Sequence, residues 1–323
     1  MIEKRIRQFE VLQNEDGLRL DEFLAFKIAR FSRSQANTCI KAGAVSICPY
    51  RPTKPALKVR AGDIVSISQT MTGDTPQYDE ISLLYENDDF WCFDKPAGMA
   101  VHPTANIYHN TVTRYVETQL NAQPFVVHRL DKDTSGVLLM AKSPSVSKLL
   151  GNAFLSHEIH KEYIAIIYNA KAHYYPGASD DIRIPLGLAG RVLPNMTMGM
   201  GSLDAHTEVH CIDTCGDFAK LNLILHSGRQ HQIRVHLALT GTPILGDKLY
   251  FFGEQFYKDF LDQKIVPNFT PHRHLLHANK LSFLWNNKSF DFSAPLPPVF
   301  DEVYKAQPSE AFFPTGYAKL FQQ

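Results

Sequence analysis

The chain of 323 residues contains no hydrophobic run that approaches the roughly 20 residues needed to span a bilayer. No apolar stretch follows Met1–Arg5, so we expect neither a signal peptide nor membrane attachment. Five cysteines are an odd number without the spacing of a disulfide framework, which favours reduced thiols and a cytoplasmic protein. Internal repeats and low-complexity segments are also missing.

Net charge is missing too, because 33 lysines and arginines balance 33 aspartates and glutamates. The balance is uneven along the chain, however. Residues 1–70 carry 12 basic against 7 acidic residues, which leaves 21 against 26 for the remainder. A basic N-terminal module followed by a mildly acidic remainder is the charge pattern of a protein whose N-terminal module attracts a polyanion. Ordinary solvated surface charge is the open alternative.

Recognisable metal motifs are scarce. The sequence lacks HExxH, and His157 and His160 have the wrong spacing for two ligands one helical turn apart. Cys211 and Cys215 have no second cysteine pair of the kind that completes a zinc site. We therefore expect no metal.

The chain is long enough for two domains, and 44% hydrophobic residues allow a substantial core. We place a small domain at residues 1–72, a polar linker at 73–80 and a larger domain at 81–323. The larger part reads mostly as strands, with two clear helices that begin near Ser143-Pro144 and His231. Because βαβ alternation is rare, we predict an α+β fold on a large, mostly antiparallel mixed sheet.

In the small domain, apolar residues at helical spacing predict a helix near 20–28 and a second from Ser32 to Gly43, followed by strands at 45–47 and 64–67. This order resembles the small RNA-binding domain first described in the fourth protein of the small ribosomal subunit. A helical cap with a solvated rim is the alternative. The basic residues expected to share an exposed helix face and contact phosphates are Lys27, Arg30, Arg33 and Lys41.

The run from His128 to Gly136, HRLDKDTSG, lies between two strand-like segments, 124–127 and 137–141. It places a carboxylate in a tight polar loop beside an arginine and two hydroxyls, which suits an ionised aspartate that attacks a substrate. These nine residues resemble the active-site loop of the RluA-type pseudouridine synthases. The further segments that agree with this family are Lys95–Gly98 with His102-Pro103, Lys161–Tyr163, Gly228–Leu237 with Gly246-Asp247, Leu276–Ala278 and Ala294–Pro297.

The resemblance implies an RNA pseudouridine synthase that flips a uridine out of its RNA, cuts the base from the ribose and rejoins it through carbon-5. No cofactor is implied, because no redox change occurs and no group is added. By resemblance, Asp131 is the catalytic carboxylate, Tyr163 stacks on the base and serves in the final proton removal, and Arg234 pairs with Asp131. Asp133 is the nearest competing carboxylate, and His128 is expected to be a structural hydrogen-bonding residue.

Five further residues are expected to contact the substrate. Arg129 would fill the space of the flipped base or bind a phosphate, and Ile233 would form an apolar wall. Arg229, Lys95 and His102 would contact the RNA backbone or base edges.

RNA is the expected partner, with ribosomal RNA favoured by the N-terminal module and tRNA as the alternative, and we expect a monomer without a nucleotide cofactor. A non-catalytic RNA-binding or ribosome-assembly protein is the second hypothesis, and a carboxylate-dependent hydrolase is the third. Asp94 stands where the family usually has asparagine. The connection 170–200 is either a mobile loop or a flexible insertion.

Overall fold

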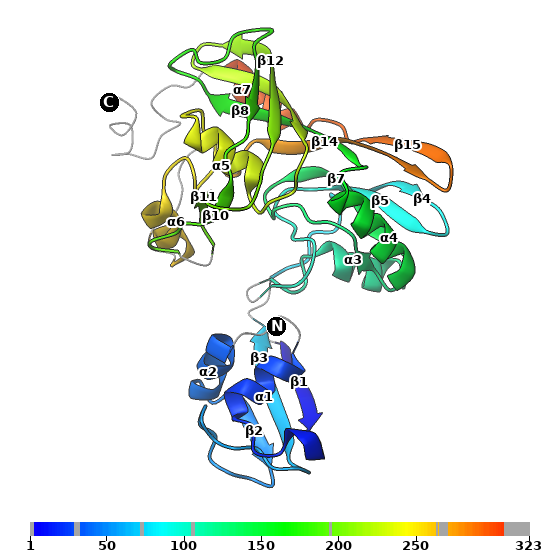
Figure 1. Cartoon of the computed structure of the whole chain (residues 1–323), viewed down its shortest axis with the longest axis vertical. Helices are drawn as coiled ribbons and strands as arrows, with labels where there is room; N and C mark the ends of the chain where they lie inside the picture. Colours follow the sequence, from blue (N-terminus) through cyan, green and yellow to red (C-terminus); the bar gives the residue numbers. More distant parts are fainter. Residues whose placement is uncertain are drawn as a thin grey trace. The chain divides into compact units, whose positions relative to one another are not determined.

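A computed structural model describes residues 3–28, 33–71, 74–104, 107–193, 196–262, 264 and 271–306 (Figure 1). Its contacts divide the chain into two units. The first comprises Met1–Thr75 with Thr104–His109, and the second comprises Pro76–Pro103 with Asn110–Gln323. The expected helix cap Ser32 and the expected RNA contact Arg30 lie outside the described residues.

The first unit packs two helices on a three-stranded antiparallel sheet of order β1-β3-β2. Its elements are β1 (Glu3–Glu10), the 3-10 helix η1 (Gln13–Glu15), α1 (Leu20–Lys27), α2 (Arg33–Lys41), β2 (Val45–Cys48) and β3 (Ile64–Met71). Leu20, Phe23 and Leu24 of α1 are fully buried against Ile47 and Ile67 of the sheet, as the helical spacing predicted. Strand β1 was not predicted, because its residues alternate too weakly to stand out from a polar leader.

The second unit is built on a ten-stranded sheet of order β4-β5-β7-β14-β8-β13-β12-β9, with β6 paired to β7 and β15 paired to β14. Its strands are β4 (Ser82–Glu86), β5 (Phe90–Lys95), β6 (Phe125–Val126), β7 (Ser135–Ala141), β8 (His160–Tyr168), β9 (Ser179–Ile182), β12 (Thr207–Cys215), β13 (Phe218–Leu225), β14 (Leu276–Trp285) and β15 (Lys288–Ser293). Among the paired strands of the described residues, β7 and β14 alone run parallel. The fold is therefore α+β on a mostly antiparallel mixed sheet, as predicted.

Helices cover both faces of this sheet near β7. Helix α3 (Val112–Gln119) buries Val112 and Val116 in the cluster that contains Leu138. Helix α4 (Pro144–Leu155) buries Val146 and Leu150 in the cluster on the opposite face, with Val137 and Leu139. Every residue of β7 is consequently buried, which gives the loop before this strand a rigid base.

Three more helices complete the unit: α5 (Gln232–Leu239), α6 (Glu254–Leu261) and α7 (Pro298–Ala306). The two helices predicted from sequence correspond to α4 and α5, and the Ser143 hydroxyl caps α4 by accepting a hydrogen bond from Val146 N. Helices α3, α6 and α7 were missed. The connection 170–200 contains β9 and a hairpin of β10 (Leu186–Leu188) and β11 (Met198–Met200). None of the helices described is long and apolar enough to cross a membrane.

Candidate active site

Asp131 lies in the polar loop that joins β6 to β7, at the start of the fully buried strand. A turn closes the loop, because Thr134 N donates to Asp131 O at 3.1 Å. Leu130 anchors the loop in the core, whereas the Asp131 side chain keeps 28% of its surface exposed. The core therefore anchors the loop backbone at Leu130, while the Asp131 carboxylate remains partly accessible to solvent.

Arg234 extends from α5 to this carboxylate. Its Nη1 donates to Asp131 Oδ2 at 2.7 Å, and its Nε and Nη2 donate to the two oxygens of Asp247 at 2.7 and 2.9 Å. Asp247 is 1% exposed and also accepts from the backbone N–H groups of Leu249 and Tyr250. Because Asp247 binds two of the three guanidinium nitrogens along one edge, the remaining nitrogen, Nη1, is directed at Asp131.

The charges in this cluster keep Asp131 ionised. Burial alone would raise the pKa of the Asp131 carboxyl, but His231, which is protonated at the low pH where this carboxyl titrates, and Arg234 outweigh burial and lower the pKa to about 2. Burial acts in the same way on Asp247, and Arg234 again outweighs it and lowers that pKa. Burial lowers the pKa of His231, so its ring is neutral near pH 7. Two carboxylates thus share one guanidinium, and the cluster carries a net charge of −1.

Tyr163 of β8 lies on a line of paired residues that crosses the sheet. Lys95 pairs with Gly136, Gly136 with Ala278, and Ala278 with Tyr163. Two strand spacings, or roughly 10 Å, therefore separate the backbone of Tyr163 from the strand that follows the Asp131 loop. Burial, and next the charge of Asp131, raise the pKa of the Tyr163 phenol, so the hydroxyl is protonated at neutral pH.

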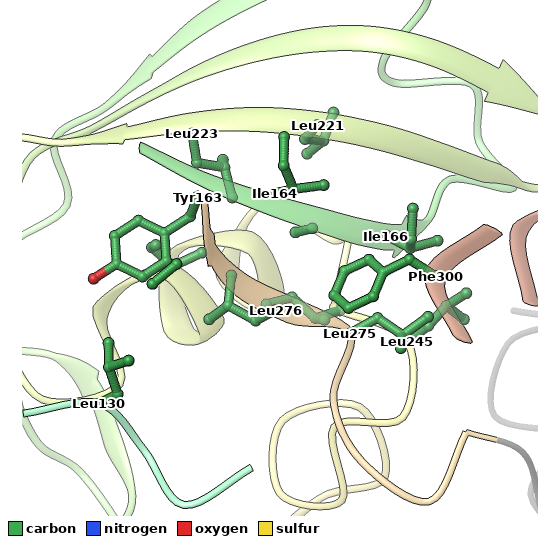
Figure 2. Packing of buried hydrophobic residues seen from close by; sticks show 14 of the residues in the cluster. Leu130, Tyr163, Ile164, Ile166, Leu221, Leu223, Leu245, Leu275, Leu276 and Phe300 are labelled. Atoms are coloured by element: carbon green, nitrogen blue, oxygen red, sulfur yellow. The ribbon is translucent and has the colours of Figure 1, made fainter. Parts of the chain in front are cut away.

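Tyr163 and Leu130 belong to the same buried cluster, and Figure 2 shows the Tyr163 ring at the end of the cluster nearer to Leu130. Ile233 is also a member and is 4% exposed. The two side chains expected to contact the base thus sit at or in the apolar core.

Gly136 permits the close approach of β7 and β14 on this line. Its φ is +111°, and a Cβ built there would lie 2.1 Å from Ala278 O. Any side chain at this position would push the two strands apart and displace the loop that carries Asp131.

Lys95 corrects an expectation. It is fully buried, and its Nζ donates to the carbonyl oxygens of Pro96, Met99 and Lys132 at 2.7, 2.8 and 3.1 Å. Burial lowers its pKa to about 7. A side chain enclosed in this way does not fit the direct RNA contact that we expected. It instead ties the Asp131 loop to the turn after β5.

Three histidines hold the loop and the strand behind it. His128 Nε2 accepts from Leu139 N at 3.0 Å, which confirms its structural hydrogen bond. His274 Nε2 lies 2.8 Å from Thr134 Oγ1, and His277 Nδ1 lies 2.8 Å from Ser135 Oγ. The hydroxyl pair of the sequence motif therefore bonds to β14 and the segment before it.

Sequence reasoning missed two residues beside Asp131. His231 begins α5 in a left-handed conformation with φ 54°, and its Nε2 lies 3.8 Å from Asp131 Oδ1. Tyr250 places its hydroxyl 2.8 Å from His231 Nδ1 and its ring 5.0 Å from the Arg234 guanidinium carbon. His231 could have been suspected from its place in the HQIR segment. Tyr250 carried no such signal, because only the fold brings it near.

The other expected substrate contacts differ in how exposed they are. Arg129 and Arg229 are exposed, and His102 is half-buried. Arg229 Nε donates to Asp204 O at 2.9 Å. Asp133, the competing carboxylate, pairs with Lys248 at 3.5 Å. No group of three or more potential metal ligands comes together among the residues described.

In the first unit, the expected basic residues differ in their surroundings. Lys27 pairs with Glu15 at 2.6 Å and is 18% exposed, so the open cation we expected is largely neutralised. Arg33 pairs with the buried Asp21 and stays 54% exposed, and Lys41 is exposed. Arg19, which we did not expect to contact phosphates, donates twice to Asp21 at 3.0 Å.

Residues 89–239 match the sequence model of the family described as RNA pseudouridylate synthase. "Ribosomal large subunit pseudouridine synthase D" of Xanthomonas campestris pv. campestris is 31% identical over 315 residues, covering 94% of this chain and 93% of that protein. The protein of the same name from Zymomonas mobilis subsp. mobilis is 29% identical over 307 residues, covering 90% and 93%. "Human RNA Pseudouridylate Synthase Domain Containing 1" superimposes with a TM-score of 0.54 at 20% identity, covering 69% of this chain and 86% of that one, and shares the fold.

Proposed function

Because the chain belongs to the RNA pseudouridylate synthase family, and by its motifs to the RluA type, we propose that Asp131 is the carboxylate with which it isomerises uridine. The observation that carries this proposal is the 2.7 Å bond from Arg234 to a carboxylate that remains 28% exposed. Arg234 occupies Oδ2, so Oδ1 is the oxygen available to the substrate. An aspartate kept ionised and accessible is what an attack on ribose, or removal of a proton from it, requires.

The reaction breaks the bond between ribose carbon-1′ and N1 of the base and forms a bond from carbon-1′ to carbon-5. Carbon-5 loses a proton and N1 gains one, so atoms and electrons balance without a cofactor. Positive charge develops on the ribose as the first bond breaks. The net charge of −1 shared by Asp131, Arg234 and Asp247 would stabilise that charge at short range.

The target base must leave its stack to reach Asp131, so we propose that the enzyme flips it. Tyr163 would provide the wall against which the base turns, backed by the core that includes Ile233. Its phenol is protonated at neutral pH, because burial raises the pKa. It could therefore accept the carbon-5 proton only while passing its own proton to an acceptor, and Asp131 is the charged group that influences its pKa most.

Exposed cations would bind the rest of the RNA. Arg129, in the loop two residues before Asp131, and Arg229, near the start of α5, are available for phosphates or for the gap left by the base. His102 stays a candidate base-edge contact. In the first unit, Arg33 and Lys41 are the most open of the expected phosphate contacts that the structure describes, and Arg19, whose side chain is 43% exposed, joins them.

Ribosomal RNA is the substrate we propose, because relatives of similar length are named for the large ribosomal subunit. tRNA is the alternative substrate. A monomer in the cytoplasm, without a cofactor, remains our expectation.

Release of tritium from RNA labelled at carbon-5 of uridine tests the substrate directly. Large-subunit rRNA, small-subunit rRNA and total tRNA from a strain lacking the protein would be supplied separately to the full chain. We expect release from large-subunit rRNA. Release from tRNA alone would reject the proposed substrate while leaving the isomerase activity intact.

A further inference from the structure

The Tyr250 hydroxyl joins the β10–β11 hairpin to the Asp131 cluster. Met198 N, in β11, donates to it at 3.0 Å, and His231 Nδ1 lies 2.8 Å away on another side. The other ring nitrogen of His231, Nε2, faces Asp131 Oδ1 at 3.8 Å. Hydrogen bonds therefore link a backbone amide of the hairpin to Tyr250 and Tyr250 to His231, and the Nε2 of His231 lies just beyond hydrogen-bond distance of the carboxylate.

The available protons determine which group donates in the hydrogen bond between Tyr250 and His231. The Tyr250 oxygen already accepts the Met198 amide proton, and it has one proton of its own to donate. Among the described residues, His231 Nδ1 is the acceptor within hydrogen-bond distance of that proton. When Tyr250 donates to Nδ1, the single proton of the neutral imidazole resides on Nε2. The ring then presents an N–H, and not a lone pair, to Asp131 Oδ1.

We propose that Tyr250 and His231 are positioning residues that orient the Oδ1 oxygen of Asp131 by holding His231 in the Nε2–H tautomer. This inference rests on the proposed role of Asp131. Arg234 holds Oδ2 by a hydrogen bond of 2.7 Å, and an Nε2–H on His231 would attract Oδ1 across 3.8 Å. The opposite tautomer would direct a lone pair at a carboxylate oxygen and repel it.

Tyr250 supports both restraints. Its ring lies 5.0 Å from the Arg234 guanidinium carbon, and its hydroxyl bonds His231. Tyr250→Phe keeps the ring and removes the hydroxyl, so it removes the bond to His231 Nδ1 together with the bond from Met198 N, and the ¹⁵N spectra are needed to isolate the tautomer. His231→Gln can place an amide N–H near the position of Nε2, whereas His231→Leu cannot donate. Both substitutions occupy the same left-handed backbone position, so their backbone cost is matched.

The experiment measures kcat and KM by tritium release from large-subunit rRNA, together with ¹⁵N spectra of histidine-labelled full-length protein. Tyr250→Phe and His231→Leu should lower kcat by about 10- to 100-fold with KM unchanged. His231→Gln should recover most of the loss. Tyr175→Phe, which changes a tyrosine that is 66% exposed, should behave as wild type.

The ¹⁵N spectra separate a tautomer effect from general damage. In wild type, the His231 resonances, assigned by their loss in His231→Gln, should show a protonated Nε2, and Tyr250→Phe should shift the proton partly to Nδ1. Wild-type kcat in both Tyr250→Phe and His231→Leu, failure of His231→Gln to exceed His231→Leu, or a protonated Nδ1 in wild type would overturn the inference. Activity that survives Asp131→Asn would instead reject the proposed function, and the spectra would still decide the tautomer.

Discussion

Arg234 Nη1 donates to Asp131 Oδ2 at 2.7 Å, although 103 residues separate the two along the chain. The same guanidinium is held by both oxygens of Asp247. Arg234 therefore does more than neutralise one charge. Asp247 fixes the orientation of its guanidinium, and this orientation directs Nη1 at Asp131. The position of the proposed catalytic oxygen depends on a helix, α5, and on the turn after it that carries Asp247.

Arg234→Leu should lower kcat more than RNA affinity. The change also leaves Asp247, which is 1% exposed, without its partner, so it should destabilise the fold by roughly 3–5 kcal/mol. Arg234→Lys should retain part of both quantities, because it keeps the charge but not the fork. Urea denaturation and tritium release at a temperature where each variant is folded measure the two effects.

The control for that variant is Arg183→Leu. Arg183 is 66% exposed and lies 3.9 Å from Asp181, so its loss should cost less than about 1 kcal/mol and leave kcat unchanged. Equal losses of kcat and RNA affinity in Arg234→Leu would contradict the role given to Arg234.

Tyr163→Phe should keep RNA binding and lower turnover, because it preserves the apolar wall and removes the hydroxyl that passes the carbon-5 proton. General acid–base groups typically contribute about 100-fold or more. Tyr168→Phe in the same strand, whose ring packs on Phe251, is the matched control. Tritium release at the wild-type rate by Tyr163→Phe would show that the hydroxyl takes no part in the reaction and that Tyr163 contributes only packing.

Gly136→Ala should destabilise the protein and abolish activity, because the new Cβ would meet Ala278 O at 2.1 Å where φ is +111°. The cost should exceed the roughly 1 kcal/mol of an ordinary substitution. Gly151→Ala in α4, where a Cβ meets nothing within 4 Å, should instead stabilise by about 0.5–1 kcal/mol. Thermal unfolding measures the melting temperatures of the two variants. Similar values would contradict the close approach of β7 and β14.

Stability should fall as the pH drops from about 6.5 towards 4. Burial lowers the pKa of His274 and His277 to about 4 and that of His128 to about 3, whereas an unfolded histidine has a pKa of about 6.5. As the pH falls, the histidines of the unfolded chain therefore bind protons before those of the folded chain. The stability that the neutral buried rings contribute is complete above pH 6.5 and is lost as the pH falls through this window. Each group should contribute roughly 1 kcal/mol per pH unit there.

Urea denaturation at pH 7.5, 6 and 5 measures this slope. His277→Asn should show a shallower slope than wild type, because one of the three groups is gone. The depressed carboxylates, including Asp131 with a pKa of about 2, act below about pH 5 and therefore lie outside the measured range. A wild-type stability that is level from pH 7.5 to 5 would contradict neutral burial of these rings.

Local sequence patterns predicted the helices and strands whose signals lie within the element itself, such as a capping residue, an apolar face or an apolar run. Helix α4 was readable from Ser143-Pro144 and its apolar face, and β7 from its continuous apolar run. Helix α3 had a usable signal, Thr111 as a cap with Val112 and Val116 four apart, that we did not recognise. Helices α6 and α7 were missed where the sequence is rich in aromatics and prolines.

Long-range geometry could not be predicted in the same way. Lysine is rarely buried, so the enclosure of Lys95 by three carbonyl oxygens contradicts the usual expectation for its type. Tyr250 stands beside Asp131 only because α5 and the following turn fold back on the loop. Asp131 and its pairing with Arg234 were identifiable from the motifs, whereas the contacts of Asp247, His231 and Tyr250 around this pair required the structure.

Comparison of Asp131→Asn with Asp133→Asn in single-turnover tritium release tests the central claim most directly. The two aspartates share one loop and have similar side-chain exposure, 28% and 32%, so general damage to the loop should affect both variants alike. We predict that Asp131→Asn releases no tritium above background while it still binds RNA, and that Asp133→Asn remains active. Release by Asp131→Asn at the wild-type rate would contradict the assignment.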